Sequence, residues 1–185
     1  MKTVLFIPGY EENLTDWRDY PKLLDAIAKK GYEIEFVPIT WENTLTEWVE
    51  EFNETYEKYD PNDVILAGFS CGAMIAMIES SRRPPLECWL FSLSPLFHED
   101  FTRITDWDDF SEAQKSDFAK YDFDEISRKV SCSVKMFCGS KEIPQLNYRF
   151  NDAKRKLRNC DAVKISGPGH DVTDDRYIAA IEGKI

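Results

Sequence analysis

The residues best suited to chemistry lie in the segment Gly68-Phe69-Ser70-Cys71-Gly72, where a serine stands between two glycines. An apolar run over residues 64–68 leads into the motif, and an apolar segment with helical spacing follows it. Gly-x-Ser-x-Gly between a buried strand and a helix is typical of the nucleophile elbow, a tight turn that raises a serine hydroxyl above a parallel sheet. Such a turn is strained and the helix packs closely behind it, so glycines are needed there. The motif therefore predicts that Ser70 is a nucleophile.

A serine hydroxyl needs an adjacent base to take its proton, and the sequence contains only two histidines. His170 lies in the glycine-rich loop 167–171, after the last apolar run. His98 is flanked by Phe97 and by the acidic pair Glu99-Asp100. We interpret His98 as an ordinary surface residue, and His170 remains a candidate base.

The segments that must position these residues alternate between apolar runs and amphipathic stretches. The sequence predicts strands over residues 3–8, 33–39, 64–68, 87–93, 134–138 and 162–166. Helices are expected over about 16–30, 44–59, 71–83, 145–158 and 174–181, and the pair Thr44 and Glu47 has the spacing of a capping box. Strands alternating with helices pair in parallel through right-handed crossovers. The expected fold is α/β: a three-layer, doubly wound, mainly parallel six-stranded sheet with helices on both faces.

Composition limits the classes of function. The chain has 185 residues, of which 43% are hydrophobic, and this suits one domain over residues 1–185. The net charge of -11 argues against nucleic acid as a partner, because such a surface repels phosphate backbones. The apolar run before Pro8 is too short for a signal peptide or a membrane span. Five cysteines without a Cys-x-x-Cys pair are typical of a reduced protein, so a cytoplasmic location is expected.

From about residue 4 to residue 181 the chain resembles the α/β-hydrolase superfamily, at its small and nearly capless end. The resemblance rests on the Ser70 motif, on His170 after the last strand and on the order serine, acid, histidine. It implies a sheet that lacks the family's first antiparallel strands and has the strand order 2-1-3-4-5-6. It also implies that His170 is the base. The order reverses between the first and third strands, so the site is expected where the loop Pro8-Gly9-Tyr10 meets Ser70.

The acid that orients His170 is open among four carboxylates. The family often places Gly-x-x-Asp after the fifth of these strands, and here the residues are Gly139-Ser140-Lys141-Glu142. Glu142 is therefore the first choice, and the alternative is that it is a solvated loop carboxylate. Glu99 or Asp100 follow the fourth strand, at the family's alternative acid position. Asp171 adjoins the base, but a sequence neighbour usually points away from its partner.

The resemblance further implies an oxyanion hole made of two backbone N–H groups. One would come from Cys71, at the start of a helix, and the other from Tyr10, since a proline stands where the family commonly has His-Gly. The Cys71 thiol is interpreted as a small side chain that the elbow tolerates.

The aromatic-rich excursion over residues 94–131 has two open interpretations: a small lid or pocket wall, with Phe97 and Tyr10 contacting substrate, or short helices packed on the sheet. Its apolar members are Phe97, Phe101, Ile104, Trp107, Phe110, Phe118, Tyr121 and Phe123.

These features predict a serine hydrolase that cleaves small or medium uncharged carboxylic esters through an acyl-enzyme, with no metal or organic cofactor. The expected partner is a small-molecule ester or acyl substrate, and the oligomeric state is open. Thioesterase, acyltransferase and peptidase activities remain alternatives because one site geometry serves them all. A non-catalytic, hydrolase-like binding protein is a further alternative. A nucleotide binder is disfavoured, since the sequence has no Gly-Lys-Ser/Thr loop.

Overall fold

A computed structural model of the chain describes residues 2–10, 16–104 and 109–185. Its strands form a single sheet in which every adjacent pair is parallel. They are β1 (Thr3–Ile7), β2 (Glu33–Phe36), β3 (Val64–Phe69), β4 (Glu87–Phe91), β5 (Ser133–Gly139) and β6 (Cys160–Ile165). Their spatial order is β2-β1-β3-β4-β5-β6, which confirms the expected fold class and the expected strand order.

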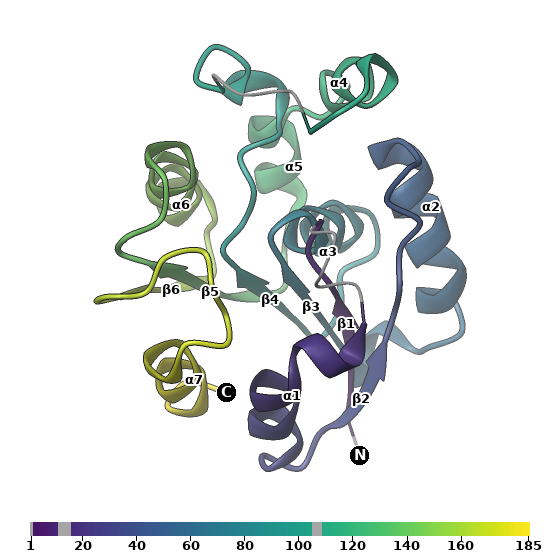
Figure 1. Cartoon of the computed structure of the whole chain (residues 1–185). Helices are drawn as coiled ribbons and strands as arrows, with labels where there is room; N and C mark the ends of the chain where they lie inside the picture. Colours follow the sequence, from purple (N-terminus) through teal and green to yellow (C-terminus); the bar gives the residue numbers. More distant parts are fainter. Residues whose placement is uncertain (1, 11–15, 105–108) are drawn as a thin grey trace.

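Helices cover both faces of the sheet, as Figure 1 shows. On one face lie α1 (Pro21–Ala28) and α7 (Asp175–Glu182). The other face is covered by α2 (Leu45–Tyr56), α3 (Cys71–Arg82), α5 (Phe123–Lys129) and α6 (Pro144–Lys156), and α4 (Glu112–Phe118) packs against α2. Three short 3-10 helices, η1 (Trp17–Asp19), η2 (Pro61–Asp63) and η3 (His98–Asp100), complete the described elements.

The core is divided by the sheet into two hydrophobic clusters. Along β1, Leu5 and Ile7 belong to the cluster beneath α2 and α3, whereas Val4 and Phe6 belong to the cluster beneath α1 and α7. Successive side chains of a strand point to opposite faces, so one strand supplies both clusters. All six residues of β3 are buried, as expected for a central parallel strand covered on both sides.

The helix expected from about residue 16 to residue 30 is divided in two. The short η1 is followed by Tyr20, and α1 begins only at Pro21. Proline suits the first turn of a helix, where its missing N–H leaves no bond unmade, but it disrupts a helix interior. As a result Trp17, which was expected on the buried face, is 59% exposed. The expectation of one continuous helix over residues 16–30 is wrong, because Pro21 can occupy the first turn of a helix but not its interior.

The start of α2 agrees with the sequence. The Glu47 carboxylate accepts from the Thr44 N–H at 2.8 Å, and the Thr44 hydroxyl accepts from the Glu47 N–H at 3.5 Å, which is the expected capping box. The strand β4 is shorter than expected and ends at Phe91, so residues 92–93 lie in a loop instead. Among the described helices, none combines the length and the apolar character that crossing a membrane requires.

The excursion over residues 94–131 contains η3, α4 and α5. In its described part, Phe97, Phe118 and Phe123 are fully buried and belong to the core cluster beneath α2 and α3. Phe101, Ile104 and Phe110 are partly buried against the same cluster. These aromatic side chains therefore pack the short helices onto the sheet. Trp107, which the sequence grouped with them, lies outside the described residues.

Candidate active site

The loop between β3 and α3 holds Ser70 in an unusual backbone conformation, with φ +55° and ψ −118°. The two glycines of the motif are there because the chain passes too close for side chains. A Cβ atom on Gly68 would lie 2.2 Å from the Gly72 carbonyl oxygen, and one on Gly72 would lie 2.3 Å from the Pro8 carbonyl oxygen. The strained turn therefore depends on glycine at both positions, and it points to a functional constraint on Ser70.

The structure brings Ser70, His170 and Glu142 together. Ser70 Oγ lies 3.0 Å from His170 Nε2, and His170 Nδ1 lies 2.9 Å from Glu142 Oε2. The three residues follow β3, β6 and β5 respectively, so they meet because the carboxyl ends of parallel strands share one edge of the sheet. An ionised carboxylate can only accept a hydrogen bond, so Nδ1 is the donor to Glu142 and Nε2 is left to accept from Ser70.

Burial differs along this chain of contacts. The Glu142 side chain is wholly inaccessible to solvent, whereas the His170 side chain is 27% exposed. The His170 ring lies 4.7 Å, centroid to centroid, from the ring of Phe69 beside the serine. The carboxylate is therefore shielded from water, the serine is buried at 7% exposure, and the imidazole is the partly exposed member of the three.

Two loops are packed together to set the separation of Glu142 and His170. Lys141 donates its N–H to the Pro168 carbonyl at 2.9 Å, and the Gly167 N–H donates to Ser140 Oγ at 2.9 Å. A Cβ atom on Gly139 would lie 2.3 Å from that same Pro168 oxygen. This close approach shows why a glycine ends β5, and it holds the loop that carries Glu142 against the loop that carries His170.

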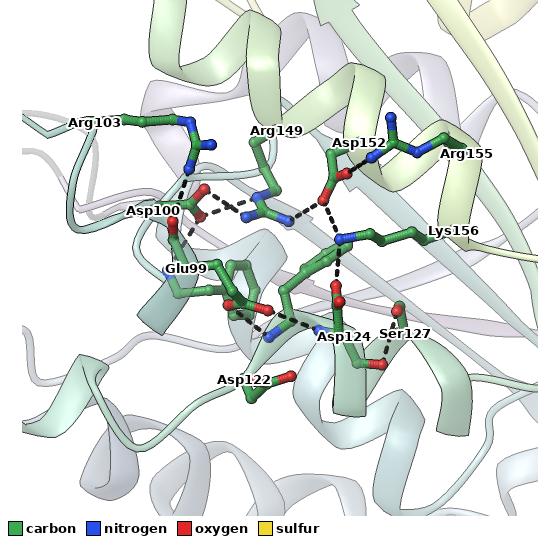
Figure 2. Close-up of polar contacts among 12 residues, drawn as sticks. Glu99, Asp100, Arg103, Asp122, Asp124, Ser127, Arg149, Asp152, Arg155 and Lys156 are labelled. Carbon is green, nitrogen blue, oxygen red and sulfur yellow. Dashed lines mark hydrogen bonds and ion pairs between the residues drawn. The ribbon is translucent and has the colours of Figure 1, made fainter.

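The other three candidate acids have different partners. Glu99 accepts the N–H groups of Phe123 and Asp124, both at 2.9 Å, at the first turn of α5. Asp100 is bound by the Arg149 guanidinium, as Figure 2 shows. Asp171 accepts from the N–H and the hydroxyl of Thr173 at 2.8 and 2.6 Å. Among the four carboxylates, Glu142 is thus the one found against the imidazole.

Asp100 belongs to a buried ionic network that joins the excursion to α6 (Figure 2). Arg149, 1% exposed, donates to Asp100 from Nε at 3.0 Å and to Asp152 at 3.1 Å. Its guanidinium also lies 3.9 Å from the ring centroid of Phe123. Burial raises the pKa of Asp100, and the bonds from Arg149 act in the opposite direction. This network explains Asp100 as a structural residue that ties η3 to α6.

The loop after β1 reaches the serine, as expected. A Cβ atom on Gly9 would lie 3.3 Å from Ser70 Cβ, and the Gly9 N–H donates to the Tyr20 hydroxyl at 3.0 Å. Cys71 is the first residue of α3, where N–H groups point along the helix axis and its dipole adds partial positive charge. The segments that carry the two expected oxyanion donors, Tyr10 and Cys71, therefore lie on either side of Ser70.

The side chains named as substrate contacts are placed differently from each other. Phe97 is fully buried, with its ring 5.1 Å from that of Phe123, so it offers no surface to a substrate, and its assignment as a substrate contact is corrected. It follows β4 in sequence, but the chain turns it inward beneath the excursion. Tyr10 is half-buried, its ring lies 5.0 Å from that of Phe110, and its hydroxyl donates to the Asp109 carbonyl at 2.9 Å.

Two serines that the sequence analysis did not single out lie within the site. Ser92 Oγ donates to Glu142 Oε1 at 2.5 Å, and Ser94 Oγ lies 3.0 Å from Ser70 Oγ. Both come from the loop after β4, two residues apart, and both are buried. The available signal was their position, because polar residues at the carboxyl end of a central parallel strand face the ligand crevice.

His98 is exposed in η3, in agreement with its interpretation as a surface residue. Across the described ranges 2–10, 16–104 and 109–185, no group of three or more His, Cys, Asp or Glu side chains is arranged to hold a metal ion. The chemistry that the described arrangement can perform is proton transfer between Ser70 and His170, with Glu142 orienting the imidazole.

Comparison with known proteins adds the following. No protein-family model and no curated protein sequence matches the chain. Solved structures do match: Est1E from Butyrivibrio proteoclasticus has a TM-score of 0.82 at 14% identity, covering 98% of this chain and 84% of that one. The CarC serine hydrolase of carbazole degradation has a TM-score of 0.71 at 11% identity, covering 99% and 90%. A thioesterase domain from the curacin biosynthetic pathway has a TM-score of 0.68 at 15% identity, covering 98% and 89%. Together with the strand order, these similarities identify the chain as a protein of the α/β-hydrolase fold.

Proposed function

We propose that this chain is a serine hydrolase that cleaves small or medium uncharged carboxylic esters through an acyl-enzyme intermediate. The observation that carries the proposal is the continuous contact from Ser70 Oγ to His170 Nε2 at 3.0 Å and from His170 Nδ1 to Glu142 Oε2 at 2.9 Å. Nucleophile, base and orienting acid at hydrogen-bond distance are the arrangement that activates a serine for acyl transfer.

In the acylation step, Ser70 Oγ attacks the carbonyl carbon of the ester while its proton passes to His170 Nε2. Glu142 accepts the Nδ1–H throughout, which fixes the tautomer and stabilises the imidazolium that forms. The carbonyl oxygen becomes an oxyanion, and the N–H groups of Tyr10 and Cys71 are the proposed donors to it. When the tetrahedral intermediate collapses, the alcohol leaves with the proton from His170.

Deacylation repeats the same steps with water in place of Ser70. A water molecule gives its proton to His170 Nε2 and attacks the acyl carbon. The second tetrahedral intermediate collapses, Ser70 takes the proton back, and the carboxylic acid is released. No metal or organic cofactor takes part in this scheme, because the imidazole performs both proton transfers.

The preference for an uncharged substrate is inferred from charge. The net charge of -11 disfavours anionic ligands. Of the two cations in the nearby loops, Arg103 lies over the Tyr148 ring at 4.0 Å and donates to the Glu99 carbonyl, and Lys141 is exposed.

Est1E, the similar structure described above, has also been solved with ferulic acid bound. The similarity to a thioesterase domain keeps thioesters as the second candidate substrate class.

The direct test is intact-mass analysis after treatment with a fluorophosphonate, in which an activated serine displaces fluoride from phosphorus. We expect one adduct on the wild type, none on Ser70→Ala and strongly slowed labelling of His170→Ala. Ser80→Ala is the matched control, because the Ser80 hydroxyl is buried in α3 and donates to the Ala76 carbonyl at 2.7 Å. A folded wild type that forms no adduct would refute the proposal in favour of a binding protein. An adduct at a residue other than Ser70 would refute Ser70 as the nucleophile.

The substrate class is tested separately, on the same preparations. A series of p-nitrophenyl esters of increasing acyl length is compared with thioesters of the same acyl groups. Higher kcat/KM for the esters supports the carboxylesterase assignment. Labelling by the fluorophosphonate together with faster thioester cleavage would retain the serine mechanism and transfer the assignment to thioesterase.

A further inference from the structure

The Glu142 carboxylate has a second partner besides the imidazole. Its Oε2 faces His170 Nδ1, and its Oε1 accepts the Ser92 hydroxyl at 2.5 Å. Ser92 is fully buried and the Glu142 side chain is wholly inaccessible, so this contact is not shared with solvent. Glu142 is thus held at both oxygens, by two residues from different loops.

The direction of the bonds follows from the protons available. An ionised carboxylate supplies none, so the single Ser92 proton points at Glu142. Ser92 Oγ is then an acceptor towards the Tyr177 hydroxyl, which lies 3.0 Å away. Tyr177, fully buried in α7, has one hydroxyl proton, which it shares between Ser92 Oγ and the Phe137 carbonyl of β5, 3.1 Å away. A chain of hydroxyls therefore runs from the backbone of β5 and from α7 to the carboxylate.

Ser92 occupies its place in a strained conformation. Its φ is +50°, in the left-handed region that favours glycine, and the only other non-glycine residue with positive φ in the described part of the chain is Ser70. A side chain in this region is strained and persists where the surroundings require it. Backbone bonding supports the conformation, since the Ser92 N–H donates to the Phe137 carbonyl at 2.8 Å.

We propose that Ser92 is a positioning residue for Glu142: its hydroxyl, supported by Tyr177, fixes the plane of the carboxylate so that Oε2 stays aligned with His170 Nδ1. This inference rests on the proposed function for its consequence in catalysis. Without the Ser92 hydroxyl, the carboxylate can rotate about its terminal bond, whose torsion is broad. Glutamate has one more rotatable side-chain bond than aspartate, so the longer acid gains more from being held at its second oxygen.

The kinetic test compares two variants that lack the hydroxyl but differ in tolerance of a positive φ. Ser92→Ala keeps the strain, and Ser92→Gly relieves it. We expect both to lower kcat by about tenfold or more with little change in KM, as for loss of one bond to a charged group. Tyr177→Phe should lower kcat by a smaller factor, and Ser80→Ala, with its equally buried hydroxyl, should leave kcat unchanged. If kcat is unchanged in Ser92→Gly, or follows the folded fraction of each variant, the inference is wrong.

A second measurement does not depend on turnover. The chain has only two histidines, so nitrogen NMR of ¹⁵N-histidine-labelled protein observes both rings, and His98→Gln assigns them. In the wild type, we expect His170 as a single tautomer protonated at Nδ1. In Ser92→Gly, the His170 signals should move towards a mixture of tautomers, while those of His98 stay fixed. Unchanged His170 signals would overturn the inference. Because this measurement needs no turnover, it tests the inference even if fluorophosphonate does not label the protein and the proposed function is wrong.

Discussion

The hydroxyl of Ser94 lies 3.0 Å from the hydroxyl of Ser70, although 24 residues separate them in the chain. Ser94 is 5% exposed, and its N–H also donates to the Ser70 carbonyl at 3.4 Å. The proton of Ser70 is directed at His170, so Ser94 is the donor in the contact between the two hydroxyls. This contact gives Ser70 Oγ a second partner, which would hold it in the orientation that the proposed attack requires.

We expect Ser94→Ala to lower kcat/KM by about tenfold, because one neutral hydrogen bond is lost at the nucleophile. The measurement is the second-order rate of fluorophosphonate labelling, followed by intact mass. This rate also reports the reactivity of the Ser70 hydroxyl, so we expect it to fall in parallel with kcat/KM. Ser127→Ala is the control, since that hydroxyl is buried in α5 and donates to the Asp124 carbonyl at 3.2 Å. Faster labelling of Ser94→Ala would contradict the expectation and identify Ser94 as a restraint on the serine.

Replacement of the acid should affect chemistry far more than stability. Glu142→Gln keeps the shape and removes the charge, so we expect kcat to fall by about 10³–10⁴-fold, as when a triad acid loses its charge. The control is Glu99→Gln, which alters the carboxylate that binds the N–H groups of Phe123 and Asp124. That variant should lose about 1 kcal/mol of stability with kcat unchanged. Equal kcat values for the two variants would remove Glu142 from the mechanism.

The elbow glycines can be tested by stability alone. In Gly72→Ala, the new methyl would lie 2.3 Å from the Pro8 carbonyl oxygen, and backbone cannot move away as a flexible side chain can. We expect a loss of about 3 kcal/mol or more in the free energy of unfolding, measured with urea. Gly183→Ala is the control, because its new methyl would lie 3.5 Å from the nearest atom, the Ala179 carbonyl oxygen. A stable Gly72→Ala would show that the loop after β1 is not held against α3.

The buried network predicts a dependence on pH. Arg149→Met leaves Asp100 buried without the guanidinium that binds both of its oxygens, so we expect a loss of about 3–5 kcal/mol in the free energy of unfolding at pH 7.5. Burial already raises the pKa of Asp100, and removing the opposing guanidinium raises it further. A raised pKa means that the folded state holds the proton more tightly, so the destabilisation is complete above that pKa and shrinks as the pH falls through it.

Urea unfolding of wild type and Arg149→Met at pH 7.5 and 5.5 measures this effect, with a smaller difference expected at pH 5.5. Arg155→Met is the control, since the Arg155 side chain is 73% exposed although it too contacts Asp152. It should cost about 1 kcal/mol or less. If Arg149→Met loses the same free energy of unfolding at both pH values, the loss does not come from a buried carboxylate without a partner, and the prediction is wrong.

Several features could be predicted from the sequence because they depend on local rules. Alternating strands and helices require a parallel sheet, and the capping box at Thr44 and Glu47 sets the start of α2. The break before Pro21 was equally local, and its signal was present but not used. The motif around Ser70 likewise reflects a turn whose strain and close contacts require glycine at positions 68 and 72.

The choice of partners depended on the tertiary structure. Glu99, Asp100, Glu142 and Asp171 were all candidate acids by position, and only the packing of the β5 and β6 loops brings Glu142 to His170. The inward turn of Phe97, and the contacts of Ser92 and Ser94, arise where β4 ends. The sequence by itself determined the sheet and the serine motif, since these follow from periodicity and motif spacing, and the resemblance to the α/β-hydrolase superfamily added His170. The tertiary structure alone decided which side chains meet, because contacts between loops from different strands depend on distances that spacing along one strand does not define.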